Sequence, residues 1–471
     1  MNRRLFLICF VALGAMVCAQ NLLTPRSAGA DEPAHLIRAA GLVRGDVFGS
    51  KTDIDVAHRS FDVPSWVGQP DPGCFVVSSA QSAGCATVVE TGDTDPVSTA
   101  GSYPVWGHIL PGLATLAPGG ARTYWLARAL HGLIPVLLLA TVLSRLIADR
   151  RSLHAAAVLL ALTPSVLFNM AVINPSGVAI AGAIAMWVAG DRLFGADADD
   201  HPDSWLFIAG SAALLLPRND GVLWWVLILA ILLGLHRRSP RSAIGEFSRV
   251  QVVMLAISVA LSVGWTVAVG SDLVTAQTDL SGWSFFEAVV GRTGDNLREA
   301  IGVVGWLDTP IPESMMSVWW LLLGVLAGIV LWLGERRRVA LAAVSMITFI
   351  VVPWVLETIQ GRTAGLFWQG RYAIPVFVGA PLLLGGVQHS KAQVDRALTV
   401  AVSSGAIIVW NVSLWQQSRR WGVGVDGTML PWRWDTWSAP LPVVPLLVIF
   451  LVSSMVLFSI VRAEAGLDRT C

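Results

Sequence analysis

Long apolar runs alternate with short polar segments along the whole chain. Most runs approach the roughly 20 residues that an α-helix needs to cross a bilayer. Barrel strands need only about 9–11 residues and alternate in polarity, so this pattern favours helices, which also satisfy their own backbone hydrogen bonds in lipid. About twelve spans are predicted, near residues 5–24, 123–146, 153–170, 173–190, 204–217, 221–235, 250–270, 316–334, 338–356, 371–388, 396–414 and 440–461.

The basic residues support this count. Counting spans from Arg3 and Arg4 puts all the dense basic clusters on one side of the membrane, and lysine and arginine gather on the cytoplasmic side. Both termini are therefore predicted to be cytoplasmic. The clusters are at 145–151, 236–241, 335–338 and 391–396, and the outer loops are 25–122, 271–315, 357–370 and 415–439.

Composition agrees with a multi-pass membrane protein that contacts lipid. Hydrophobic residues make up 54% of the chain and charged residues 14%, against about 25% charged in soluble domains. The net charge is zero, and no P-loop or dinucleotide-binding glycine motif is present, so no nucleic-acid partner and no soluble nucleotide site is expected. Lys51 and Lys391 are the only lysines, an arginine bias that suggests a GC-rich bacterial genome and hence the bacterial plasma membrane.

The start of the chain has two interpretations. Arg3 and Arg4, the apolar run 5–19 and Ala28-Gly29-Ala30 resemble a secretory signal with its cleavage site. An uncleaved first helix is favoured, because the run is long for a signal. In both cases the segment that follows lies outside the cytoplasm.

Two cysteines share the first outer loop. An exported loop meets an oxidising compartment, so a disulfide between Cys74 and Cys85 is predicted, with two free thiols as the alternative.

The segment that begins at Asp31 holds the candidate chemistry, since it directly follows the first span on the outer side. Pro33 suits a first helical turn and the acidic residues suit its cap, so a helix is predicted to begin here. His35 and Arg38 then follow on one face. The carboxylate of Asp31 or Glu32 can act as a general base toward a sugar hydroxyl, or hold a divalent cation. Capping with a salt bridge to Arg38 is the structural alternative.

Three further sets of polar residues fall on the same side of the membrane, and two of them contain arginine. These arginines can bind a phosphate bidentately, or reach lipid headgroups instead. Charges at membrane depth are commonly functional or paired, whereas a plain turn is the alternative for the first and last set. The sets are Arg218-Asn219-Asp220, then Arg362 with Gly370-Arg371-Tyr372, and Asp308 before Thr309-Pro310.

The last outer loop, 415–439, is rich in tryptophan. An aromatic belt at the membrane interface is the favoured interpretation, and sugar stacking is the functional alternative. The tryptophans are Trp415, Trp421, Trp432, Trp434 and Trp437.

Taken together and in this order, these features resemble the bacterial membrane proteins of domain-of-unknown-function family 2142 (DUF2142). The resemblance covers most of residues 1–390. The matching segments are Asp31-Glu32-Pro33-Ala34-His35 after the first span, Tyr103-Pro104, Arg128, Thr163-Pro164, Asn174-Pro175-Ser176-Gly177, Gly305-Trp306-Leu307-Asp308-Thr309 and Gln369-Gly370-Arg371-Tyr372 before Pro375.

That family looks related to the C-type glycosyltransferases (GT-C), which take sugar from a polyprenyl-phosphate donor at the outer face. The resemblance implies an all-α polytopic fold of about 12 transmembrane helices with a large first extracytoplasmic loop. It implies a GT-C-like domain over 1–390, followed by the last two helices over 391–471.

The same resemblance implies inverting transfer to a cell-envelope acceptor. Asp31 would be the base, with Glu32 and His35 shaping the site; no cofactor is assigned, and a divalent cation stays open. The residues expected to bind substrate are Arg38, Arg218, Asn219, Asp220, Asp308, Arg362, Arg371 and Tyr372.

Two other classes of function stay open. A carrier or flippase for lipid-linked glycans would explain the many spans, and the inner loop 144–152 loosely resembles a signature of major facilitator transporters. Few charges lie at mid-membrane depth, however, where carriers need them. A non-catalytic subunit of an envelope assembly is the third possibility.

Overall fold

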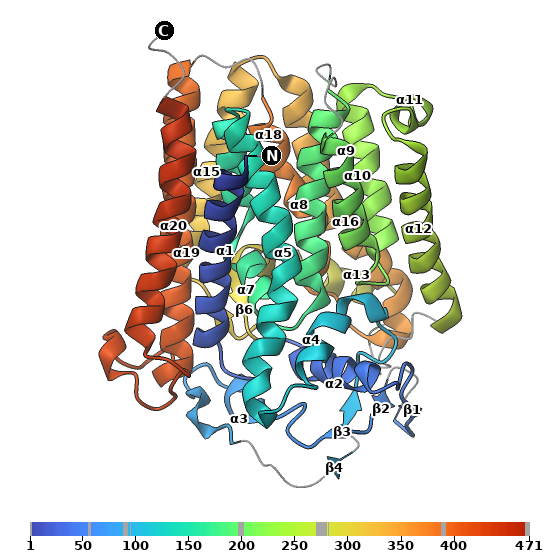
Figure 1. Ribbon diagram of the computed structural model, residues 1–471, viewed down its shortest axis with the longest axis vertical. Coiled ribbons are helices and arrows are strands. Elements are labelled where there is room, and N and C mark those ends of the chain that lie inside the picture. The colour runs from blue at the N-terminus through green and yellow to red at the C-terminus, as the bar shows by residue number, and fades with distance from the viewer. Residues whose placement is uncertain are drawn as a thin grey trace.

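The computed structural model describes residues 2–54, 58–87, 93–94, 96–195, 202–269, 280, 282–387 and 392–466. Long helices run side by side as a bundle, and short helices and strands gather at one end of it, here called the loop end (Figure 1). The opposite end, here called the basic end, carries the basic links after α5 and α10. Lys391 and parts of the predicted loops 25–122 and 271–315 lie outside the described residues.

Seven helices among the described residues are long and apolar enough to cross a membrane, and a bent pair would make an eighth. The seven are α1 (Arg3–Leu23), α5 (Thr123–Ala148), α12 (Arg249–Val269), α15 (Glu313–Trp332), α16 (Arg336–Ala364), α19 (Ala392–Val423) and α20 (Val443–Gly466).

The other predicted spans also fall on helices, but these are shorter or less apolar, so the number twelve stays a prediction. They are the bent pair α6 (Ser152–Ala161) and α7 (Pro164–Ala171), then α8 (Pro175–Leu193), α9 (Pro202–Leu215) and α10 (Gly221–His236), and the run of η4 (Gly370–Ala373), α17 (Ile374–Phe377) and α18 (Gly379–Gly385).

Smaller helices lie mainly at the loop end. They are α2 (Glu32–Val43), α3 (Gly73–Val76), η1 (Ala83–Cys85), η2 (Val105–Gly107), α4 (Ile109–Ala114), η3 (Gly120–Arg122), α13 (Gly282–Gly291), α14 (Thr293–Gly302) and η5 (Pro431–Arg433), with α11 (Pro240–Ile244) at the basic end.

Seven two-residue strands lie at the loop end among the described residues, and all their pairings are antiparallel. Ser50 of β1 pairs with Ser60 of β2, and Val97 of β5 pairs with Ser60 from the other side. The strands are β1 (Ser50–Lys51), β2 (Arg59–Ser60), β3 (Val63–Pro64), β4 (Asp93–Thr94), β5 (Val97–Ser98), β6 (Val303–Val304) and β7 (Thr309–Pro310), which form the sheets β1-β2-β5, β3-β4 and β6-β7.

Proline after a capping residue divides the middle of the bundle. Thr163 and Asn174 each stand just before a proline, and their side chains accept from the backbone N–H of Val166 (3.3 Å) and Ser176 (3.0 Å). Both sites therefore start a helix with an N-cap and proline at the first position. The first of them separates α6 from α7, which are bent by 70°.

The interruption of the helix between α6 and α7 leaves carbonyl groups inside the bundle without helical partners, and tryptophan side chains donate hydrogen bonds to them. Trp319 Nε1 donates to the carbonyl of Leu160 (3.0 Å), and Trp410 Nε1 donates to that of Leu162 (2.5 Å). The hydroxyl of Thr163 donates to the Ala300 carbonyl (2.8 Å). A buried helix end needs such partners, because an unpaired carbonyl in an apolar core is costly.

The central helix α8 meets α9 backbone to backbone. A Cβ atom on Gly182 would lie 2.7 Å from the Gly210 carbonyl oxygen, and one on Gly210 would lie 2.8 Å from that of Gly182. Small residues allow this close approach, which is how helices pack in lipid. Both positions therefore depend on glycine.

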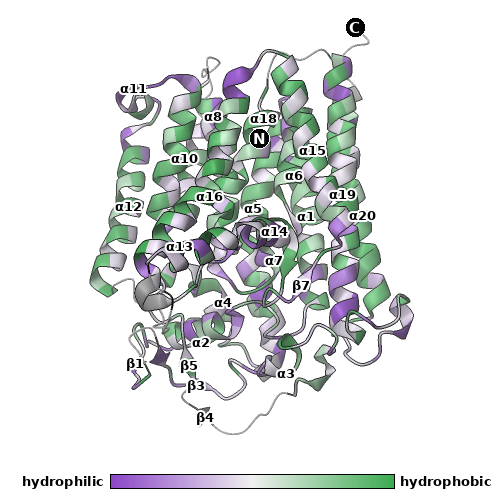
Figure 2. Cartoon of the chain, turned by 180° about the vertical axis from the view of Figure 1, so that it is seen from behind, coloured by the Kyte–Doolittle hydropathy of each residue, from purple (hydrophilic) through white to green (hydrophobic). Residues whose placement is uncertain are grey.

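The outer surface of the bundle is apolar along the helices and polar at both ends (Figure 2). On α12, for example, Val250, Val253, Ile257 and Val267 are all exposed. A soluble protein rarely leaves so much apolar surface in contact with water, whereas lipid is a matching solvent. The distribution agrees with a protein embedded in a membrane.

A disulfide and an arginine hold the segment around α3 at the loop end. Cys74 and Cys85, the pair that the sequence singles out, are bonded, with their Cα atoms 6.1 Å apart. The buried guanidinium of Arg420 in α19 donates to the carbonyls of Phe75 (2.6 Å) and Gln81 (2.8 Å). The two clamps act on the same short segment.

Replacing both bonded cysteines, Cys74→Ser with Cys85→Ser, should loosen this segment by about 2–4 kcal/mol, because the open chain gains conformational entropy. Limited proteolysis should then cut between residues 72 and 86 faster than in the wild type, while the long helices stay protected. Cys18→Ser, at a free cysteine, is the control. Equal cleavage rates would show that Arg420 alone holds the segment.

Candidate functional site

Glu32, the first residue of α2, forms a buried ion pair with Arg128 of α5. Arg128 Nε and Nη2 donate to the two carboxylate oxygens at 2.7 Å each, and both side chains are fully buried. The backbone N–H groups of Ile173 (2.9 Å) and Gly29 (3.2 Å) donate to the same oxygens. Each oxygen of Glu32 thus has two donors, which favours a structural role over the catalytic role predicted for this residue.

Arg128 also closes the end of α1. Its Nη1 donates to the carbonyls of Asn21 (3.1 Å) and Thr24 (2.7 Å), and its Nη2 donates to that of Pro25 (2.7 Å). The last carbonyls of a helix lack hydrogen-bond partners within the helix, and here the guanidinium of Arg128 donates the hydrogen bonds that they need. One pair of side chains therefore fixes the turn that leads from α1 to Asp31.

Asp31 stands at the cap position of α2 but does not cap it. Its backbone is left-handed, with φ of +61°, and its side chain makes no hydrogen bond to the helix. Instead the carboxylate forms an ion pair with Arg371, and its side chain stays one-third exposed. The sequence prediction of a helix start is right, but the carboxylate is left available to the surface.

Arg371 is held in place by α14 and by the turn before α2. Its Nη1 donates to the Ala30 carbonyl (3.1 Å), and the N–H of Gly370 donates to Glu299 (2.5 Å). A Cβ atom on Gly370 would lie 2.1 Å from the carbonyl oxygen of Asn296, so only glycine allows this contact. Burial raises the pKa of the Glu299 carboxyl.

Arg218 lies beside two tyrosines. Its Nε and Nη2 donate to Asp220 at 2.8 and 3.0 Å, and its Nη1 donates to the hydroxyl of Ser176 (2.8 Å). Its guanidinium carbon is 4.8 Å from the ring centre of Tyr372 and 6.0 Å from that of Tyr103. These distances are those of cation–π contacts.

The Tyr372 ring also lies 5.3 Å from the guanidinium carbon of Arg371. Two arginines from separate parts of the chain therefore meet at one ring, next to the carboxylate that one of them binds. We call Asp31, Tyr103, Arg218, Arg371 and Tyr372 the Asp31 cluster.

His35 is buried beside this cluster, with its ring against that of Tyr103. Its Nδ1 is 3.1 Å from Nε2 of His108, whose Nδ1 is 3.0 Å from the Pro104 carbonyl. The carbonyl can only accept, so His108 carries its proton on Nδ1 and accepts from His35 through Nε2. Burial lowers the pKa of both imidazoles well below the usual 6.5, helped by the charge of Arg371 near His35.

Two of the other predicted substrate-binding residues, Arg38 and Asp308, lie apart from the Asp31 cluster. Arg38 is buried against the rings of Phe61 and Trp265 and donates to the Val47 carbonyl, and burial lowers its pKa to about 10. The predicted alternative of a salt bridge between the acidic pair and Arg38 is wrong, because Glu32 pairs with Arg128.

Asp308 forms an ion pair with Arg420 (2.5 Å) and accepts from the N–H of Trp306 (2.9 Å) within its own turn. It thus joins the clamp on the disulfide segment. Asn219 donates to the Ser102 carbonyl (3.5 Å) beside the cluster. Arg362 lies near the end of α16, and its side chain is outside the described part of the structure.

An apolar groove of about 250 Å³ runs between α4, α5, α8 and α9. At one end it is lined by Gly107 and Pro217, the chain neighbours of His108 and Arg218. A Cβ atom on Gly107 would lie 3.3 Å from Pro217, so these two segments are in contact. The groove therefore ends beside the Asp31 cluster.

The family model described as "Predicted membrane protein (DUF2142)" matches residues 15–380. The chain belongs to the DUF2142 family. The resemblance noted in the sequence is thus confirmed, and the kinship to GT-C enzymes stays a prediction. No curated protein and no solved structure matches the chain.

The sequence did not predict two residues of the candidate site, Glu299 and His108. Glu299 supports Gly370, yet a single acidic residue in the amphipathic α14 gives no signal of that contact. His108 lies in a short apolar stretch between Pro104 and Pro111, where a single histidine gives no signal of a site. Its link to His35 spans 73 residues, and no local pattern indicates such a pair.

Among the described residues of this DUF2142 protein, no three histidine, cysteine or carboxylate side chains are grouped as a metal site needs. The acidic residues of the region are instead paired with arginines: Asp31 with Arg371, Glu32 with Arg128, and Asp220 with Arg218. The side chains around Asp31 are arranged for an anion more than for a cation.

Arg128→Met should destabilise the protein by about 3–5 kcal/mol, because it leaves Glu32 charged, buried and unpaired. The double variant Arg128→Met with Glu32→Gln should recover part of that loss, since no net charge then remains. The midpoint of thermal unfolding in detergent measures both. Arg433→Met, at an exposed arginine, is the matched control, and a single variant as stable as this control would contradict the assigned role.

Acid should destabilise the loop end through His35 and His108. Below about pH 6.5 these imidazoles bind protons in the unfolded chain but stay neutral in the folded protein. Their contribution to the free energy of unfolding is therefore present above that pH and falls as the pH drops. The double variant His35→Gln with His108→Gln should flatten the dependence of the unfolding midpoint on pH. A slope as steep in the double variant as in the wild type would contradict the assignment.

Proposed function

We propose that this DUF2142 protein is an inverting glycosyltransferase of the GT-C type. It transfers a sugar from a polyprenyl-phosphate donor to a cell-envelope acceptor, which is a glycan, a lipid or an exported protein. The observation that carries the proposal is the Asp31 cluster, where an accessible carboxylate and two arginines lie at the end of an apolar groove.

The orientation proposed for the chain puts the loop end outside the cytoplasm, with twelve spans and both termini inside a bacterial plasma membrane. The basic links lie at the opposite end, in line with the cytoplasmic preference of arginine. The disulfide at Cys74 and Cys85 supports the same orientation, because disulfides persist in oxidising compartments.

In this proposal the donor lies across the groove and the cluster. The groove between α4 and α9 takes part of the prenyl chain, which is apolar and flexible. Arg218 and Arg371 bind the phosphate, since guanidinium groups pair with phosphate oxygens bidentately. The donor phosphate then competes with the Asp31 carboxylate for Arg371 and releases it.

Asp31 acts on the acceptor once it is released. Its carboxylate takes the proton of the acceptor hydroxyl, whose oxygen forms a bond to the anomeric carbon of the sugar as the bond from that carbon to the phosphate oxygen breaks. The electron pair stays on the departing polyprenyl phosphate, and Arg218 and Arg371 stabilise the charge that develops there. Direct displacement inverts the anomeric configuration.

Glu32 and His35 are positioning residues in this scheme. Glu32 fixes the turn beside Asp31 through Arg128, and His35 supports the underside of the cluster through His108. Neither side chain is accessible, so neither contacts substrate.

A carrier is the second candidate, because the broken span α6–α7 is typical of transporters that bind ions at unwound backbone. Here the carbonyls of Leu160 and Leu162 are bonded to tryptophan Nε1 groups instead of lining a cavity. The break is thus closed within the protein, which favours the enzyme.

Asp31→Asn should lower the rate of sugar transfer by about 10²–10⁴-fold, the contribution of a general base. Asparagine tolerates the left-handed backbone at this position, so the fold should be kept. The measurement is transfer of label from radiolabelled polyprenyl-phosphate sugars to an envelope extract by protein in lipid nanodiscs. Asp435→Asn, at an exposed aspartate of the same end, should transfer like the wild type.

Two outcomes would contradict the proposal in different ways. Full transfer by Asp31→Asn would remove the base assignment only. No transfer by well-folded wild-type protein from any donor would favour the carrier or the assembly subunit.

A further inference from the structure

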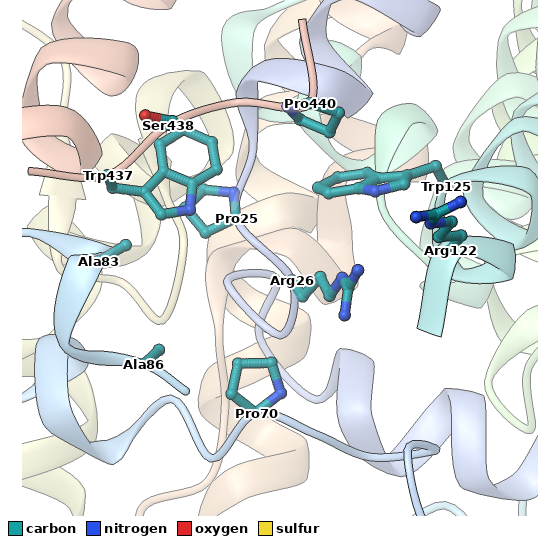
Figure 3. Close-up of a pocket in the computed structure, with 10 residues that line it drawn as sticks. All are labelled: Pro25, Arg26, Pro70, Ala83, Ala86, Arg122, Trp125, Trp437, Ser438 and Pro440. Carbon is teal, nitrogen blue, oxygen red and sulfur yellow. The ribbon is translucent and has the colours of Figure 1, made fainter. Parts of the chain in front are cut away.

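A second cavity opens at the loop end, between the end of α1, the start of α5 and the loop before α20 (Figure 3). Its volume is about 570 Å³, larger than the groove beside the Asp31 cluster. None of its ten lining residues is among the predicted substrate-binding residues, although Trp437 belongs to the loop for which sugar stacking is the alternative prediction. We call it the tryptophan pocket after Trp125 and Trp437, which line it.

The two indole rings stand on opposite sides of the pocket, with Pro25 and Pro440 near them (Figure 3). Arg26 reaches in below the rings, and its guanidinium carbon lies 5.8 Å from the ring centre of Trp125. Arg122 lies on the same side of the pocket as Trp125.

The walls of the pocket are held by contacts from separate parts of the chain. The N–H of Trp437 donates to the Gly422 carbonyl (3.3 Å), and that of Val425 donates to the Ser79 carbonyl (3.0 Å). The Trp125 carbonyl accepts from the Asn21 side chain (3.1 Å). The pocket is therefore built before any ligand enters, which lowers the entropic cost of binding.

The charged residues that the structure describes along this pocket are both arginines. Two of its ten lining residues are arginines and none is acidic. A lipid-facing aromatic belt needs only the rings at the interface, and it does not need two guanidinium groups inside a cavity of this size. Aromatic faces stack on the apolar faces of sugar rings, and arginines bind carboxylate or phosphate.

We propose that the tryptophan pocket binds a saccharide that carries a carboxylate or a phosphate. The sugar ring packs against Trp437 in the space beside Trp125, and its anionic group pairs with Arg26 and Arg122. The role of the pocket as an acceptor site rests on the proposed function, whereas the binding of an anionic saccharide does not.

The position of the pocket suits an acceptor chain. Arg26 and Asp31 are five residues apart, so even a fully extended backbone would separate them by no more than about 18 Å. An oligosaccharide of several units bridges such a gap. A chain anchored in the pocket by one charged sugar can thus present a later hydroxyl to Asp31.

Binding is tested with a tetrasaccharide of alternating glucuronate and N-acetylglucosamine, and with a neutral tetrasaccharide of N-acetylglucosamine. Both are titrated calorimetrically into protein in zwitterionic phosphatidylcholine nanodiscs. The anionic probe should bind the wild type at least about tenfold more tightly than the neutral one, since its charged group adds charge-assisted hydrogen bonds to the arginines.

Variants and matched controls assign the site. Arg26→Gln with Arg122→Gln should weaken the anionic probe by about tenfold or more, and Trp437→Ala should weaken both probes. Arg433→Gln and Trp432→Ala, at exposed residues of the adjacent loop that do not line the pocket, should bind as the wild type does.

The outcomes separate this proposal from the catalytic one. Asp31→Asn should bind the anionic probe as the wild type does, even though its rate of sugar transfer is strongly lowered. Equal binding of both probes, or unchanged binding by the arginine variant, would overturn the proposal. So would loss of probe binding in nanodiscs that contain phosphatidylglycerol, because the pocket would then be a site for a lipid headgroup.

Discussion

The buried pair of Glu32 and Arg128 is the interaction on which the loop end depends. Moving a single charge into an apolar interior costs several kcal/mol even after the protein relaxes, so neither residue could be buried alone. Here each compensates the other, and backbone groups supply the remaining partners of both. The pair thus converts two costly charges into a rigid joint between α1, α2, α5 and the link before α8.

Asp31 is the immediate neighbour of that joint. Its left-handed backbone is stable only if the residues around it over-determine the turn, and Glu32 does so from one side. On the other side η4 presents Arg371, itself held by α14 through Glu299. The neighbouring acidic residues differ in role because one faces the interior and the other the surface, a distinction that comes from the three-dimensional fold.

Sequence patterns predicted the helices well, because apolar length is a local property. They also located the start of α2 from its proline and acidic residues, and the pair Cys74 and Cys85. They could not predict that α6–α7 bends, since a Thr-Pro pair inside an apolar run is compatible with a straight, kinked span. They could not assign partners either. Glu32 and Arg128 are 96 residues apart, and nothing along the chain indicates which arginine a buried carboxylate will meet.

Arg420 links the last two long helices to the rest of the protein. The family match ends at residue 380, but α19 packs on α6, α20 packs on α1, and Arg420 ties Asp308 to the segment around Cys74 and Cys85. The loop before α20 also provides one wall of the tryptophan pocket. The last two long helices are therefore not an appendage. Recombination that exchanged them between relatives would need to carry the matching loop-end segment along with them.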